Sequence, residues 1–394
     1  MAGRNMTESK HSPKVSVFIP YYNDRDYLAC AIESVLAQDF EDFELVLLNH
    51  SSTDDCRQIA HSYKDSRIVH LDYAPNLGAG SGLLVEAFLK VARGEYVKLF
   101  CADDRMRPNC LSTMLKFMRE HPEADFAFGN VEYMSKGGAL SGQTFFEKRP
   151  FFSTDNDEAE CLRLFMDGVS FLPYIGSFAK RSAFDGVALD GTLIMLFDMS
   201  LWVGFLTAGR KIGYCETVVA DYRVHAAQMS SSSGANNELA LRRSYFERLA
   251  FEKFLVNFGD AEIARRAFAD NPHSGKIRDS FDAGFVAAHE LLSRGYVGGY
   301  MRIHEMLCDP AARSLLWERF GYGIAEFRRD YSAERSKRRS LAGFKNWKKG
   351  IYAARPKDLR LGQLCFLFAR SFFNAIAGIF KTLRRALRRK PITL

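Results

Sequence analysis

The first hundred residues alternate between short apolar runs and segments with helical spacing, and this alternation restricts the fold more than any other feature. After each run comes a polar turn and then a stretch of about ten residues whose apolar positions recur three or four apart, which is typical of a helix. Strands that alternate with such helices form parallel βαβ units. The sequence therefore predicts an α/β fold with a doubly wound, mostly parallel sheet. The predicted strands are Val15–Pro20, Phe43–Leu48, Arg67–Asp72 and Tyr96–Cys101.

Three polar turns stand near the carboxyl ends of these predicted strands: PYYND, NHSSTDD and CADDR. In doubly wound sheets, ligands bind beyond the carboxyl ends of the strands. We therefore expect the three turns to meet at a common binding site.

Composition and cysteine spacing indicate a folded protein in a reducing compartment. The chain of 394 residues is long enough for two domains. Apolar residues make up 47% of it, which predicts a sizeable core. The eight cysteines show no C-x-x-C pair and no zinc-type spacing, so a cytosolic setting is favoured over a disulfide framework. Residues 1–13 are polar and are predicted to be a flexible tail rather than a signal peptide.

Charge is distributed unevenly along the chain. The formal net charge is +7, but residues 335–394 contain 17 lysines and arginines and one acid, which is +16 and leaves −9 for residues 1–334. An acidic body with a basic tail predicts that any anionic surface is met by the tail.

The adjacent carboxylates Asp103 and Asp104 are suited to holding a divalent cation. A nucleotide sugar leaves a diphosphate behind when its glycosidic bond breaks, and a hard cation held by carboxylates neutralises that charge. Taken alone, an acid pair in a turn is more often simply solvated.

The order of several motifs removes this ambiguity. VSVFIPYYN, SVLAQ-x-F-x-D-FEL, SSTDD, PNLG and A-x-GEYVKL-x-x-ADD-x-x-x-P follow one another over roughly a hundred residues. This series resembles the nucleotide-binding half of a family 2 glycosyltransferase of the inverting, bacterial type, which has the GT-A fold. The resemblance covers residues 14 to 233 and leaves the C-terminal third outside it.

The resemblance implies a set of residues that bind the nucleotide sugar and a metal. The family's metal motif, usually D-x-D, corresponds to Cys101–Asp103, so that Cys101 replaces its first acid, Asp103 is the expected ligand of Mg²⁺ or Mn²⁺, and Asp104 lies beside it. Asn49 stands where the family usually has an Asp that hydrogen-bonds the base, and an amide can still donate and accept there. The implied nucleotide-sugar-binding residues are Pro20, Tyr22, Asn23, Asn49, Ser51, Asp103, Asp104 and Arg223.

Two later segments extend the resemblance. Residues 197–207 (FDMSLWVGFLT) are predicted to form a helix. Its start, FDMSLW, is similar to the family's helix that begins E-D-x-x-L-W, which implies that Asp198 is the catalytic base. Asp185 and Asp190 are competitors in the same acceptor-side region. YRVH and the residues after it are similar to the family's closing loop, so Arg223 would pair with phosphate oxygens and His225 would ligate the metal or contact the diphosphate.

The C-terminal tail has the pattern of a membrane-associating helix. Apolar residues recur three or four apart from Leu361 to Leu387, and six cations lie between Lys381 and Lys390. The longest uncharged run, Ser371–Phe380, has ten residues, whereas a full span needs roughly 20. We therefore expect an interfacial helix at an anionic membrane surface. Packing of this helix against the catalytic domain is the alternative, and nucleic acid is disfavoured because it would not use the apolar stripe.

The sequence thus predicts a metal-assisted, inverting transferase that moves a sugar from a nucleotide-diphosphate sugar, with a UDP-sugar favoured, to a saccharide or lipid-linked acceptor. It would lie in the cytoplasm, peripheral on the inner face of the plasma membrane. A catalytically silent nucleotide-sugar-binding protein on the same fold is the alternative, because Asn49, Cys101 and Phe197 replace acids. The predicted parts are residues 1–13 (tail), 14–234 (GT-A domain), 235–345 (helical region) and 346–394 (basic amphipathic tail).

A nicotinamide-dependent oxidoreductase is a further alternative, suggested by the glycines Gly78, Gly80 and Gly82. These glycines follow the third predicted strand rather than the first, and their spacing is not G-x-G-x-x-G. This alternative is therefore weak.

Overall fold

The computed structural model describes residues 12–77, 82–148, 153–167, 171–226, 228 and 247–332. The predicted amphipathic tail, residues 346–394, lies outside the described residues. So do residues 1–11 and the predicted boundary at residues 234 and 235.

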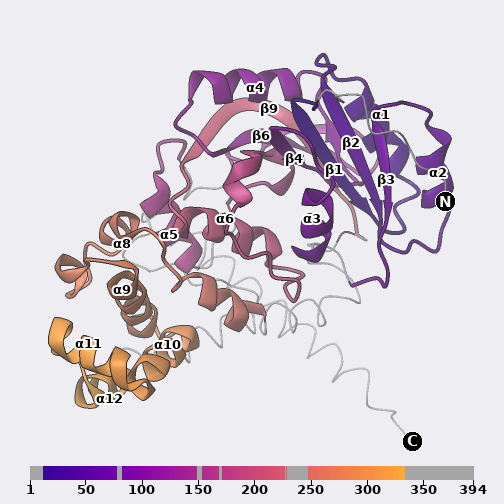
Figure 1. The fold of residues 1–394 in the computed structure, drawn as a ribbon. Coiled ribbons are helices and arrows are strands. Elements are labelled where there is room, and N and C mark those ends of the chain that lie inside the picture. Colours follow the sequence, from indigo (N-terminus) through magenta and orange to yellow (C-terminus); the bar gives the residue numbers. More distant parts are fainter. Residues whose placement is uncertain are drawn as a thin grey trace, which may run out of the picture.

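A sheet of nine strands forms the centre of the described chain (Figure 1). The four strands predicted in the first hundred residues are confirmed, each within two residues at either end. The strands are β1 Val15–Tyr21, β2 Phe43–Asn49, β3 Ile68–Asp72, β4 Tyr96–Leu99, β5 Arg105–Met106, β6 Phe126–Ser135, β7 Leu140–Thr144, β8 Ser177–Lys180 and β9 Ile212–Val224.

The sheet confirms the doubly wound prediction and adds an antiparallel part. The strand order is β3-β2-β1-β4-β8-β6-β9-β5, with β7 on β6. The first four strands of this order are parallel to one another. Strand β8 is antiparallel to both of its neighbours, and β6 and β9 are again parallel. The carboxyl ends of β1, β2 and β4 therefore lie at one edge, as the turn positions predicted.

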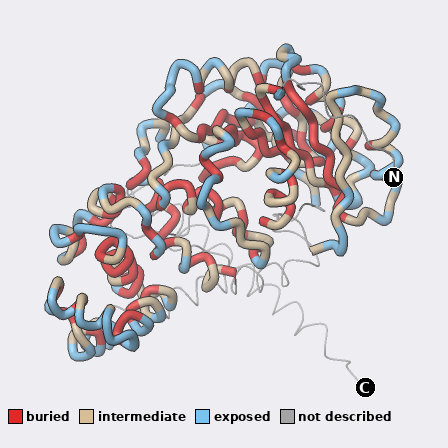
Figure 2. The backbone as a smooth tube through the Cα atoms, viewed as in Figure 1, coloured by how far each residue is buried: buried red, intermediate tan, exposed pale blue. Residues whose placement is uncertain are grey.

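Helices cover both faces of the sheet, and the core has a part on each face (Figure 2). Val17 and Ile19 of β1 pack with α1, α2 and α4, whereas Phe18 between them packs with α3, α5 and α6 on the other face. Strands buried on both faces are near-continuous apolar runs, which explains the pattern of the sequence. The helices and 3-10 turns of this part are α1 Leu28–Leu36, α2 Cys56–Ser62, α3 Gly82–Leu89, α4 Cys110–Glu120, α5 Glu158–Met166, η1 Tyr174–Gly176, η2 Arg181–Phe184 and α6 Phe197–Thr207.

The described residues 247–332 are predominantly helical, as predicted, and these helices gather beside the sheet (Figure 1). Asp260, Asp279 and Asp309 cap three of them by accepting backbone N–H groups of the first turn. Helix α8 packs against α5 and α6, so the apolar core continues from the sheet into this region. Residues 247–254 are helical as well. The further elements are α8 Ala261–Ala267, η3 Ser274–Lys276, α9 Ser280–Ser293, α10 Val297–Cys308, α11 Pro310–Phe320 and α12 Ile324–Ser332.

Within the described part of the chain, no helix combines the length and the apolar character that crossing a bilayer requires.

Candidate active site

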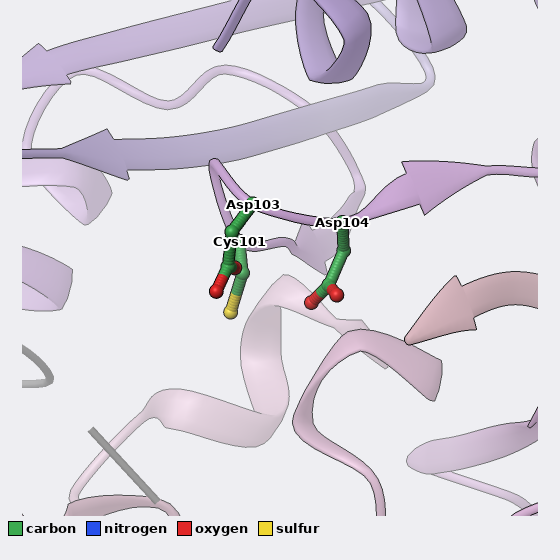
Figure 3. A group of neighbouring side chains, drawn as sticks. All are labelled: Cys101, Asp103 and Asp104. Carbon is green, nitrogen blue, oxygen red and sulfur yellow. The ribbon is translucent and has the colours of Figure 1, made fainter. Parts of the chain in front are cut away.

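The loop between β4 and β5 carries the predicted metal motif. The ligand atoms of Cys101, Asp103 and Asp104 all lie within 4.8 Å of one another, and the three side chains point to the same side of the loop (Figure 3). Cys101 and Asp103 are half-buried, and Asp104 is 1% exposed. The loop thus collects one thiol and two carboxyls at the carboxyl end of a central strand, as predicted.

Asp104 has one carboxylate oxygen bound and the other left free. Its Oδ1 accepts the backbone N–H of Arg223 at 2.7 Å, while its Oδ2 is buried with no hydrogen-bond partner. Burial and the neighbouring charge of Asp103 raise the pKa of Asp104 well above its usual range. A buried oxygen without a partner is costly, and a cation between these side chains would satisfy it.

The end of β9 brings His225 to the same loop. Its Nε2 lies 3.1 Å from Asp103 Oδ2, and its side chain is 6% exposed. The Tyr27 ring lies 4.9 Å from the imidazole. The two residues predicted to hold a metal, Asp103 and His225, are therefore in contact, although they are 122 positions apart in the chain.

Arg223 is part of the wall of the site rather than an open cation. Its Nε donates to the main-chain oxygen of Asp103 at 2.7 Å, and its Nη1 donates to that of Lys136 at 2.8 Å. The guanidinium also lies over the Tyr27 ring. These two bonds use two of the five N–H donors of the guanidinium, and its predicted pairing with phosphate oxygens stays a prediction.

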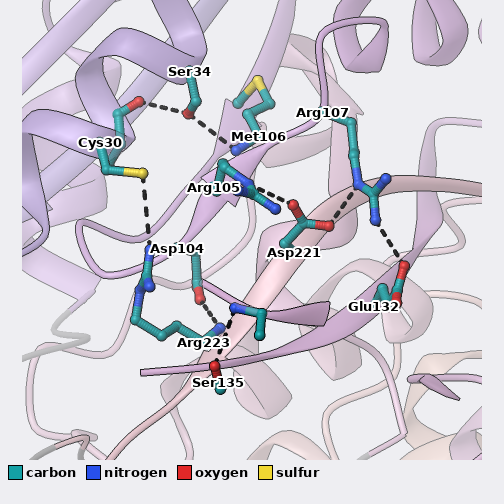
Figure 4. A network of polar contacts seen from close by, with 12 residues as sticks. Cys30, Ser34, Asp104, Arg105, Met106, Arg107, Glu132, Ser135, Asp221 and Arg223 are labelled. Atoms are coloured by element: carbon teal, nitrogen blue, oxygen red, sulfur yellow. Dashed lines mark hydrogen bonds and ion pairs between the residues drawn. The ribbon is translucent and has the colours of Figure 1, made fainter. Parts of the chain in front are cut away.

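Asp221 fixes the loop to β9 through two arginines (Figure 4). This fully buried carboxylate accepts one hydrogen bond from Nε of Arg105 (2.7 Å) and another from Nε of Arg107 (2.5 Å). Arg107 also donates to Glu132 of β6. Because Arg105 follows Asp104 directly, these ion pairs hold the metal motif at the edge of the sheet.

The first predicted turn is built around Asn23. This residue has a positive φ of 56°, and its Oδ1 accepts the backbone N–H of Thr53 at 2.8 Å. The turns after β1 and β2 are thereby joined. Tyr22 beside it is 43% exposed and is available to a ligand, and Pro20 pairs with Leu48 inside the sheet.

Asn49 ends β2 and is 6% exposed. Its amide donates to Asp72 at the end of β3 (2.9 Å) and accepts the backbone N–H of Ser52 (3.0 Å). Ser51 has a φ of 60° and donates its hydroxyl to the main-chain oxygen of Tyr73. In this arrangement both ends of the Asn49 side chain are engaged within the protein, and the carboxylate beside them belongs to Asp72. The predicted contacts of Asn49 and Ser51 with the nucleotide stay predictions.

Asp198 is the second residue of α6, where the sequence predicted a helix with these bounds. Part of the side chain is accessible to solvent, yet the surrounding protein is dense enough that burial raises its pKa to about 6. The charges of Asp104, Asp103 and Asp198 all contribute to raising the pKa of the Cys101 thiol, after burial as the largest cause. Asp198 is therefore near enough for its charge to act on Cys101 of the metal motif.

The two competitors of Asp198 differ in position. Asp185 is exposed and borders a depression with Lys14 and Asp42, which precede β1 and β2 and so mark the opposite edge of the sheet. Asp190 uses its carboxylate to accept the backbone N–H and the hydroxyl of Thr192. Its main-chain oxygen accepts the N–H of Gly82 at the start of α3, on the carboxyl-end side of the sheet, so Asp190 stays a competitor.

Asp24 belongs to this group of acids but was not predicted from the sequence. Burial raises its pKa to about 6, and the charges of Asp103 and Asp54 add to the effect. It adds a carboxyl to the acidic group around Cys101. The available signal was its position directly after Asn23 in the first polar turn.

Comparisons with known proteins agree with this arrangement. Residues 16–185 match the family described as "Glycosyl transferase family 2". A relative in Escherichia coli, UDP-Glc:alpha-D-GlcNAc-diphosphoundecaprenol beta-1,3-glucosyltransferase WfaP, is 27% identical over 55% of this chain and 80% of its own. The putative teichuronic acid biosynthesis glycosyltransferase TuaG of Bacillus subtilis is 27% identical over 61% of this chain and 91% of its own.

The fold has a counterpart among solved structures. The crystal structure of Staphylococcus aureus TarS, residues 1–349, superposes with a TM-score of 0.51 at 15% identity, covering 86% of this chain and 93% of that one. With the motif series, the sheet and the family match, the chain is a glycosyltransferase with the GT-A fold, and its residues 16–185 belong to glycosyl transferase family 2.

Proposed function

We propose that the chain transfers a sugar from a nucleotide-diphosphate sugar, with UDP as the favoured nucleotide, to a hydroxyl of a saccharide or lipid-linked acceptor, with inversion at the anomeric carbon. One observation carries this proposal: the carboxyl of Asp198, whose pKa is about 6, lies in the same electrostatic environment as the Cys101–Asp104 motif. A base and a diphosphate site on one side of the sheet are what direct displacement needs.

The donor side is assigned to the loop after β4. Asp103, Asp104 and His225 would hold Mg²⁺ or Mn²⁺, because they offer oxygen and nitrogen ligands, among them the unpartnered Oδ2 of Asp104. A bound divalent cation supplies charge neutralisation for the departing diphosphate. The exposed ring of Tyr22 and the turns joined by Asn23 would receive the nucleoside.

The acceptor side is assigned to Asp198. In the proposed step its carboxylate takes the proton of the acceptor hydroxyl while that oxygen bonds to the anomeric carbon and the bond to the diphosphate oxygen breaks. A pKa of about 6 keeps the group ionised at neutral pH and still basic enough to accept a proton. One base and one leaving-group site give inversion in a single displacement.

The names of the relatives support the choice of donor and acceptor. That of the E. coli relative states a UDP-glucose donor, a diphosphoundecaprenol-linked acceptor and a β-linked product. That of the B. subtilis relative states teichuronic acid biosynthesis. A diphosphoundecaprenol-linked acceptor and teichuronic acid biosynthesis support a saccharide or lipid-linked acceptor here.

The anomeric configuration of the product tests this proposal. With an α-linked UDP-sugar as donor and Mn²⁺ present, we expect a β-linked product in the proton NMR spectrum, since a single displacement inverts the centre. The same reaction with excess chelator should give no product. An α-linked product would contradict the single-base mechanism.

We further propose that residues 346–394 hold the enzyme at the inner face of the plasma membrane. Lys381, Arg384, Arg385, Arg388, Arg389 and Lys390 would face anionic headgroups. Each such cation contributes about 1 kcal/mol, so replacing three arginines by glutamine should lower partitioning onto anionic vesicles by about a hundredfold. Cosedimentation measures this, with neutral vesicles as the control. Unchanged partitioning would refute the assignment.

A further inference from the structure

Cys101 occupies the position of the first acid in the metal motif, and the proposed function makes no use of its sulfur. Its thiol is free of any disulfide and faces Asp103 and Asp104 across less than 4.8 Å. Figure 3 shows the sulfur beside the two carboxylates and directed to the same side of the loop.

We propose that Cys101 is a thiolate ligand of the metal, and that this makes the site prefer borderline transition ions such as Co²⁺ and Zn²⁺ to Mg²⁺. The inference deepens the proposed function, because it concerns the same site, and it rests on that function only for the role of the ion. Thiolate and imidazole ligands favour transition metals, whereas all-oxygen sets suit Mg²⁺. The set offered here is one sulfur, one nitrogen and carboxylate oxygens, from Cys101, His225, Asp103 and Asp104.

The spacing of these atoms suits one ion. Metal–sulfur bonds of about 2.3 Å and metal–oxygen bonds of about 2.0–2.2 Å place two ligands at most about 4.5 Å apart. The three atoms of the loop lie within 4.8 Å of one another, close to this upper limit, so the side chains would close around a single ion. The 3.1 Å between His225 Nε2 and Asp103 Oδ2 matches two adjacent ligands on one ion.

The second observation that points to a ligand is the buried Oδ2 of Asp104, which has no partner. Arg223 holds the other oxygen of this carboxyl, so the free oxygen cannot turn away without breaking that bond. Binding replaces the thiol proton by the metal ion, and the proton passes to the buffer. Sulfur, carboxylates and imidazole then surround a single charge of +2, which offsets the repulsion among the acids.

Co²⁺ is the probe that reads the sulfur directly, because thiolate ligation produces a charge-transfer band in the near ultraviolet. The full-length, chelator-treated protein is titrated with Co²⁺ alone under a phosphine reductant, which adds no competing thiol. We expect the band in the wild type and in Cys308→Ser, and its loss in Cys101→Ser. Cys308 is the matched control because it is exposed and its Sγ lies 3.7 Å from His304, a second place where Co²⁺ could find sulfur and nitrogen.

Metal preference provides the second measurement. In Cys101→Asp the motif has three carboxylates, so the affinity ratio of Co²⁺ to Mg²⁺, measured by calorimetry, should fall by at least about tenfold. An unchanged melting temperature of the metal-free variant shows that it folds. The proposal is overturned if the wild type shows no band, if the band survives in Cys101→Ser, or if the ratio is unchanged in Cys101→Asp.

The Co²⁺ titration contains no sugar donor, so it tests the thiolate ligand independently of the proposed sugar transfer. A band in a protein that transfers no sugar would support the ligand and reject the proposed function. Metal-dependent transfer by a protein without a band would do the reverse.

Discussion

Replacing Asp198 by Asn is expected to lower kcat for sugar transfer by about a hundredfold to ten-thousandfold, the usual contribution of a general base. The amide has nearly the shape of the carboxylate but cannot accept the proton of the acceptor hydroxyl. Its position at the start of α6 and its contact with the backbone N–H of Met199 can be kept. A coupled assay of released UDP measures the effect.

Asp185→Asn is the matched control for this variant. Asp185 is an exposed aspartate at the opposite edge of the sheet, and its replacement should leave kcat within about twofold, as is usual for surface positions. The dissociation constant for UDP with Mn²⁺ should be unchanged in Asp198→Asn, because the donor lies on the other side of the reacting centre. Near-wild-type kcat in Asp198→Asn would reject the base assignment.

Replacing Trp202 by Ala is expected to reduce the free energy of unfolding by about 3–5 kcal/mol, the range for losing a large buried aromatic side chain. Trp202 is 1% exposed, and its ring contacts Phe126 and Phe128 of the sheet and Phe205 of its own helix. It stands one helical turn after Asp198. The cavity left by the indole would therefore loosen the start of α6, which carries the proposed base Asp198, as well as the core.

Urea unfolding followed by circular dichroism measures this loss, and Trp317→Ala is the control. Trp317 is 64% exposed on α11, and its removal should change the free energy of unfolding by no more than about 0.5 kcal/mol. Trp202→Phe keeps most of the volume and should lose less than Trp202→Ala. Equal effects of the 202 and 317 alanine variants would show that α6 is not anchored as described.

Much of the fold could be predicted because the relevant signals are local. Strands β1 to β4 are short, largely apolar runs, and α6 was predicted as a helix with its observed bounds. Helix α4 was overlooked although Cys110, Leu111, Met114 and Met118 share one face of it. The two-residue strand β5 has no local signal, since its pairing with β9 exists only in the folded sheet.

Candidate residues of the site could be selected from the sequence, but their contacts could not. The motif order selected Asp103, Asp198 and His225 as candidates, and the structure places the first and last of these in contact. Nothing in the sequence indicated that the Arg223 guanidinium would donate to main-chain oxygens, or that the Asn49 amide would donate to Asp72. Such choices depend on distances between strand ends, which the residue pattern does not specify.

The pH dependence of kcat/KM tests the central claim, that Asp198 acts as a base beside the metal motif, most directly. Because the base must be deprotonated and its pKa is about 6, activity should be level at neutral pH and fall about tenfold per unit below pH 6. Asp24 has a similar pKa, so the profile is measured for Asp24→Asn and Asp198→Asn as well. The account predicts that the acidic fall persists in Asp24→Asn and is absent from the residual activity of Asp198→Asn. A fall that disappears with Asp24 and remains without Asp198 would contradict it.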